Sequence, residues 1–109
     1  MPWLLRDGEV LAALEVADSF KGRLRGLLGR DGLDGALLIE STKAVHTVGM
    51  RFPIDVAFCD ADMVVLTTLC LRRHRLCLPR LKAHCAIEAE AGAFERWRLR
   101  PGDTLEVKG

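Results

Sequence analysis

The sequence predicts a mainly β domain, either an antiparallel sandwich or a partly open barrel. Three turn signals support this prediction: Asp7-Gly8, Asp60-Ala61-Asp62 and Pro101-Gly102 each follow or precede a strand-like stretch. Tight turns of these residue types connect antiparallel neighbours, whereas parallel strands need a long crossover connection. Because turns rather than crossover helices join most of the expected strands, we expect a mostly antiparallel arrangement.

The N-terminal third is expected to hold a hairpin and then a helix. Residues 3–6 and 9–16 flank the Asp7-Gly8 turn and are strand-like. Asp18-Ser19 offers a helix N-cap, and Gly29 is well placed to end the helix. The apolar residues between them recur at helical spacing and are Phe20, Leu24, Leu27 and Leu28. We therefore predict a helix near residues 19–28.

The remainder of the chain is expected to add strands and one short helix. Strands are predicted over residues 36–39, 44–48, 54–58, 63–71, 84–90 and 103–107, and a helix near 91–98. In the segment 54–58, the apolar residues Ile54, Val56 and Phe58 alternate and should share one face. The run 63–71 is the longest apolar stretch and fits a buried strand.

Composition favours one domain without nucleic-acid or membrane partners. The 109 residues correspond to a single domain, 1–109, which can form a core without disulfides or metals. A net charge of +1, few aromatic residues and no Tyr argue against nucleic-acid binding. No apolar run reaches the length of a membrane span, and the N-terminus lacks the basic region of a signal peptide. We therefore expect a cytoplasmic protein; its oligomeric state is left open.

The four cysteines, at positions 59, 70, 77 and 85, predict reduced and mostly buried thiols. They contain no Cys-x-x-Cys pair, which argues against a zinc ribbon or a redox motif. The histidines also lack the spacing of metal ligands. We therefore expect neither a metal nor a cofactor.

Polar residues are conspicuous in the strand-like block HTVGMRFPIDVAF, residues 46–58, which carries His46, Arg51 and Asp55. Asp is a poor strand former, so Asp55 needs an explanation. It can form an ion pair with Arg51 or cap a backbone segment. It can also lie on the floor of a shallow pocket, or simply face solvent. Arg51 precedes Pro53 in a loop, where its planar group suits either carboxylate and phosphate recognition or bracing against Asp55.

Four blocks resemble, in order, a bacterial and archaeal family of unknown function, domain-of-unknown-function family 192. The blocks are RLRGLLGR at 23–30, HTVGMRFPIDVAF at 46–58, AIEAEAG at 86–92 and LRPGD at 99–103. The resemblance covers residues from about 10 to 107 and implies a compact, mostly β domain of sandwich type. It implies no established activity. Many members carry signal peptides or lipoprotein signals, whereas this chain is expected to begin at the domain itself.

The chain resembles the branch of this family that has a His in the central block. It departs from the usual pattern at Met63, where the family often has a turn Gly, and at Glu90, where the family often has Pro. Many members have a Trp-Met-Lys-Asn stretch where this chain has residues 47–51. Roles of that Trp, Lys or Asn are therefore not transferred to this chain.

These observations favour a non-enzymatic β module that binds a small polar or anionic ligand or a protein partner. Its expected ligand-binding residues come mainly from the central block, with two from flanking elements: His46, Met50, Arg51, Asp55, Arg23 and Glu88. One alternative is a small hydrolase in which His46 is the general base. Another is a structural adaptor that docks through the basic loop 72–75.

Overall fold

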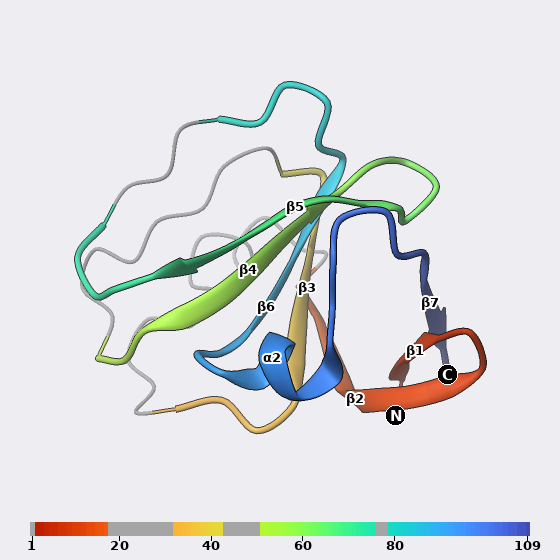
Figure 1. Ribbon diagram of the computed structural model, residues 1–109, viewed down its shortest axis with the longest axis horizontal. Coiled ribbons are helices and arrows are strands. Elements are labelled where there is room, and N and C mark those ends of the chain that lie inside the picture. The colour runs from red at the N-terminus through yellow and green to blue at the C-terminus, as the bar shows by residue number, and fades with distance from the viewer. Residues whose placement is uncertain (1, 18–31, 43–50, 76–78) are drawn as a thin grey trace.

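The structure is a computed structural model, which describes residues 2–17, 32–42, 51–75 and 79–109. Seven strands of these residues form one sheet in the order β5-β4-β6-β3-β2-β1-β7 (Figure 1). In chain order, the described elements are β1 (Trp3–Arg6), β2 (Glu9–Ala17), β3 (Ala36–Glu40), β4 (Ile54–Cys59), β5 (Val65–Leu71), β6 (Cys85–Glu90), α2 (Ala93–Trp97) and β7 (Leu105–Lys108). The mainly β fold predicted from the sequence is confirmed.

The sheet is mixed rather than purely antiparallel. Every neighbouring pair is antiparallel except β2 and β3, which run parallel with Leu14 opposite Ala36. Parallel neighbours need a crossover between them, and residues 18–35 supply a connection of the required length. The mostly antiparallel arrangement predicted from the sequence is therefore confirmed, and this one pair is its parallel exception.

The two edges of the sheet approach each other without closing it. Val64, just before β5, forms an isolated bridge with Thr104, just before β7. Backbone hydrogen bonds from Val65 to the Asp103 carbonyl, 2.8 Å, and from Leu105 to the Met63 carbonyl, 2.9 Å, reinforce this contact. Because β5 and β7 do not pair along their lengths, the sheet is a partly open barrel, one of the two architectures predicted.

The backbone conformations at Asp7-Gly8 and Pro101-Gly102 agree with the hairpin and the turn predicted there. Asp7 and Gly8 both have positive φ, 51° and 79°, as a two-residue hairpin turn between β1 and β2 requires. Gly102 has a φ of 95°, and the Asp103 amide donates to the Arg100 carbonyl at 3.1 Å. This geometry agrees with the Pro-Gly turn expected there. β1 also pairs with β7, so the two ends of the chain lie side by side (Figure 1).

Both faces of the central strands are buried. One face packs Leu38, Ala57 and Ile87 against Phe94 of α2. The other buries Ile54 together with Val56 and Phe58, as the alternation predicted. β4 is buried along its whole length. The interpretation of the Asp55 face as a solvent face is therefore wrong.

The strand after the Asp60–Asp62 turn differs from its prediction. β5 begins at Val65 rather than Met63, because Met63 has a φ of 63° and belongs to the turn. It lies at the edge of the sheet, and Val65 is its only buried residue. The apolar run 63–71 therefore forms an edge strand and not a buried one. The short helix predicted near 91–98 is confirmed as α2. The predicted helix near 19–28 and strand over 44–48 lie outside the described residues.

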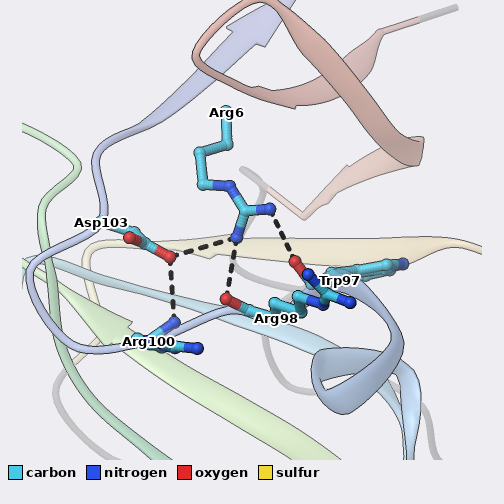
Figure 2. Close-up of polar contacts among 5 residues, drawn as sticks. All are labelled: Arg6, Trp97, Arg98, Arg100 and Asp103. Atoms are coloured by element: carbon cyan, nitrogen blue, oxygen red, sulfur yellow. Dashed lines mark hydrogen bonds and ion pairs between the residues drawn. The ribbon is translucent and has the colours of Figure 1, made fainter.

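Arg6 of β1 ties the N-terminal hairpin to the segment after α2 (Figure 2). Its guanidinium donates to the carbonyl oxygens of Trp97, at 2.6 Å, and Arg98, at 3.1 Å. It also pairs with the Asp103 carboxylate at 3.1 Å. Asp103 in turn accepts a hydrogen bond from the Arg100 amide at 3.0 Å. This network holds β1, the end of α2 and the turn before β7 together.

Candidate functional site

Asp55 is a backbone cap for helix α2. Its Oδ2 accepts hydrogen bonds from the amides of Gly92, at 2.9 Å, and Phe94, at 3.1 Å. Gly92 occupies the N-cap position and has no side chain to satisfy these donors, so the cap comes from β4. Of the roles considered for Asp55 from the sequence, a backbone cap is therefore present. A ligand-binding role for Asp55 remains a prediction.

Glu88 lies on the opposite face of the sheet from Asp55. In the pairing of β4 with β6, Asp55 is opposite Ala89 and Glu88 is opposite Val56. Only 3% of Glu88 is exposed, and burial raises the pKa of its carboxyl from 4.5 to about 7. A buried carboxyl that titrates near neutral pH is typical of functional positions, although structural carboxyls also show it. A site containing both carboxylates would have to cross the sheet.

Of the other residues predicted to bind a ligand, the structure describes Arg51 alone. Arg51 is exposed in the loop that leads into β4. Arg23, His46 and Met50 lie outside the described residues. The hydrolase alternative, which depends on His46 as general base, therefore stays a prediction.

A basic depression of about 350 Å³ lies at the end of β5. Pro53 lines it on one side, and the loop residues Arg72, Arg73, His74 and Arg75 line the rest. Leu71 pairs with Ile54, so the loop leaves the sheet beside the entry to β4. His74 has a φ of 60°, which turns the chain tightly. The basic loop predicted from the sequence thus has a definite shape, and it lies at the sheet end where Arg51 is found.

A second hollow, of about 550 Å³, lies between β5 and α2 and is lined in part by Asp55, Cys70 and Arg98. Asp55 and Cys70 are directly opposite in the pairing of β4 with β5. Desolvation raises the pKa of the Cys70 thiol, and the neighbouring Asp55 carboxylate raises it further. Because the reactive form of cysteine is the thiolate, this environment disfavours Cys70 as a nucleophile.

A cluster of three sulfur atoms was missed by the sequence analysis. Cys59 and Cys85 are opposite each other on β4 and β6, and the Cys85 thiol donates to the Met63 thioether at 3.5 Å. A hydrogen bond between the two thiols raises the pKa of Cys59, and burial raises it further. The same hydrogen bond lowers the pKa of Cys85. Only the strand register brings Cys59 and Cys85 together. Their spacing along the chain does not indicate that they are neighbours.

The described ranges hold no group of three His, Cys, Asp or Glu side chains arranged to bind a metal ion. Within the same ranges, no helix has the length and apolar character to cross a membrane.

By its fold, this protein is a small, mainly β domain built on one partly open sheet. The chain belongs to DUF192, the family described as "Uncharacterized ACR", which it matches over residues 4–107. The resemblance seen in the sequence is therefore confirmed. Comparison with curated proteins finds no match.

Two solved structures share the fold. A protein of Sinorhizobium meliloti 1021, provisionally described as a transcription regulator, has a TM-score of 0.81 and 22% identity, covering 97% of this chain and 91% of its own. A protein of unknown function from Novosphingobium aromaticivorans DSM 12444 has a TM-score of 0.78 and 17% identity, covering 96% and 82%. At these identities the likeness concerns the fold alone.

Proposed function

We propose that this protein is a non-enzymatic module that binds a small anionic ligand in the basic depression at the end of β5. The observation that carries this proposal is the grouping of Arg72, Arg73 and Arg75 around one hollow of about 350 Å³. The whole chain has a net charge of only +1, so this concentration of positive charge is local. A local basic hollow favours a ligand that fits within it over an extended polyanion.

The chemistry of the lining groups indicates phosphate or carboxylate. Arginine is charged at all physiological pH values, and its planar group donates paired hydrogen bonds to both anions. Arg51 stands two residues before Pro53, which lines the depression, so it adds a further cation at the same end of the sheet. Several cations around one hollow favour a ligand with two or more negative charges. The ligand-binding role expected for Arg51 from the sequence fits this location.

The test is a calorimetric titration with inorganic phosphate and, separately, citrate at low ionic strength. We expect binding with a Kd near or below about 1 mM. Arg73→Ala and Arg75→Ala should each weaken binding several-fold, and the double variant further. Added salt should also weaken it, because exposed charges are screened over about 10 Å at 0.1 M.

Arg100→Ala is the matched control. Arg100 is an exposed arginine at the turn before β7, and its described hydrogen bond to Asp103 uses the backbone amide (Figure 2). Its replacement removes one positive charge and leaves the basic depression intact. Equal losses of affinity in Arg100→Ala and Arg73→Ala would show that the anions respond to net charge only. That result, or no heat of binding at millimolar phosphate and citrate, contradicts the proposal.

A further inference from the structure

Three sulfur atoms from three separate segments meet at one end of the sheet. Cys59 ends β4 and Cys85 begins β6, and the two are direct partners in the strand register. Both belong to the buried cluster on the α2 side of the sheet. Met63 comes from the turn between β4 and β5, and its Sδ lies 3.5 Å from the Cys85 Sγ. The cluster thus combines two thiols and one thioether.

Met63 is held in place by a turn that most side chains disfavour. Its φ of 63° is in the left-handed region, which glycine tolerates best. Its amide donates to the Asp60 carbonyl at 3.0 Å, and its carbonyl accepts from the Leu105 amide at 2.9 Å. The Asp60 carboxylate ties the same turn by accepting from the amides of Asp62 and Val64. A backbone held in an unfavourable conformation by its surroundings is grounds for considering a function.

The cluster has a route to solvent. A cavity of about 270 Å³ is lined by Met63 and Cys85, with Glu40 and His84 among its other walls. Cys59, the strand partner of Cys85, is fully buried and does not line the cavity. A small ion entering this cavity would meet the thioether and the Cys85 thiol first, beside the carboxylate of Glu40.

We propose that Cys59, Cys85 and Met63 form a binding site for one soft monovalent metal ion of the Cu(I) class. Thiolate and thioether sulfurs are the ligands that select Cu(I) over harder cations. Metal–sulfur bonds of about 2.3 Å, as known for zinc thiolates, bring sulfurs that share an ion to within about 4 Å of each other. The 3.5 Å between Met63 Sδ and Cys85 Sγ already meets this requirement.

Binding changes no oxidation state. Each of the two thiols releases its proton to solvent and forms one metal–sulfur bond, and the Met63 thioether donates a lone pair without losing a proton. The site holds three sulfur ligands and is independent of the basic depression. A disulfide between Cys59 and Cys85 is the competing use of the same thiols, but it would leave Met63 without a role.

The test uses the full chain with Cys70→Ser and Cys77→Ser, which removes the other two thiols of the four. Under anaerobic conditions, Cu(I) is offered in competition with the chelator bicinchoninate. We expect one Cu(I) per chain and a thiolate-to-copper absorption in the ultraviolet. Cys85→Ala should weaken binding by more than about 100-fold, because it removes a metal ligand, and even the loss of a residue that only orients a ligand costs metal sites about 10–100-fold.

Variants of Met63 test whether the cluster is a metal site or only a pair of core thiols. Met63→Leu keeps the volume of the side chain, and Met63→Gly suits the left-handed backbone, so both variants should fold. Each should weaken Cu(I) binding by about tenfold or more. Met63→Leu decides the question even if Cys85→Ala does not fold.

Three outcomes overturn the proposal. The first is no uptake of Cu(I) by the reduced protein, whether or not Cys59 and Cys85 form a disulfide on oxidation. The second is uptake that Met63→Leu leaves unchanged. The third is Zn(II) binding as tight as Cu(I) binding, since that would show a site without preference for soft ions.

Discussion

The carboxylate of Asp55 on β4 accepts a hydrogen bond from the amide of Phe94 in α2 at 3.1 Å. With the bond from Gly92, one oxygen satisfies two of the amides that open the helix. A helix of only five residues is not stable by itself in water. The position of α2 therefore depends on a side chain far away in the sequence, together with the burial of Phe94 against the sheet.

Replacing Asp55 should loosen α2. Asp55→Ala leaves two amides without their acceptor, and at least the Phe94 bond is buried, so we expect a loss of about 2 kcal/mol in the free energy of unfolding. Asp55→Asn keeps one neutral acceptor and should cost less. Urea unfolding measures both, and Asp62→Ala, an exposed Asp, is the control. Equal stability of Asp55→Ala and Asp62→Ala would show that the cap is unimportant.

Arg6 should stabilise the fold through geometry as well as charge. Arg6→Ala removes the ion pair with Asp103 and the donors to two carbonyl oxygens, with an expected loss of about 1–3 kcal/mol. Arg6→Lys should restore only part of it, because an ammonium group lacks the planar fork that reaches all three oxygens. Thermal unfolding of both variants tests this, with Arg100→Ala as the control. Full rescue by Lys would show that charge alone matters.

Gly35 should tolerate no side chain, unlike Gly8. A Cβ at Gly35 would lie 2.5 Å from the Ala13 carbonyl oxygen, and its φ is 89°. Gly8 has a similar φ of 79° but open space around it. We expect Gly35→Ala to cost about 3 kcal/mol or more, from strain and overpacking together, and Gly8→Ala about 1 kcal/mol, from strain alone. Chemical denaturation of the two variants compares these costs, and similar values would contradict the packing argument.

The elements that the sequence predicted correctly depend on neighbouring residues. The Asp7-Gly8 hairpin and the Pro101-Gly102 turn are encoded by two residues each. The parallel pairing of β2 with β3 is different, because it depends on where the chain returns after residues 18–35. Gly35, which permits the close approach to Ala13, gives no sign of this role in the sequence.

The candidate sites were harder to predict because they combine residues that lie far apart in the sequence. Asp55 was recognised as unusual, but its partners Gly92 and Phe94 follow 37 and 39 residues later. The sulfur cluster requires the register of β4 with β6, together with a Met in a left-handed turn. Only the basic depression was indicated directly, since its four basic residues are consecutive.

Glu88 should make the protein less stable as the pH rises. Its carboxyl has a pKa of about 7 in the folded protein, against 4.5 in an exposed reference state, because it is buried. Between these values the folded state binds more protons than the unfolded state, so stability falls with rising pH. The contribution of Glu88 is fully present below about pH 4.5 and is lost as the pH rises through 7. One pKa unit corresponds to about 1.4 kcal/mol, so the loss amounts to about 3 kcal/mol.

Glu88→Gln removes the titrating group and keeps its shape. Urea unfolding at pH 5 and pH 8 should show a smaller difference in stability for Glu88→Gln than for the unchanged protein, by up to about 3 kcal/mol. Glu90→Gln is the matched control, because Glu90 is the exposed last residue of the same strand and points to the same face as Glu88. Its pH dependence should follow the unchanged protein. If Glu88→Gln keeps the full pH dependence, the pKa of Glu88 is not raised in the folded protein, and groups that stabilise its charge offset the effect of burial.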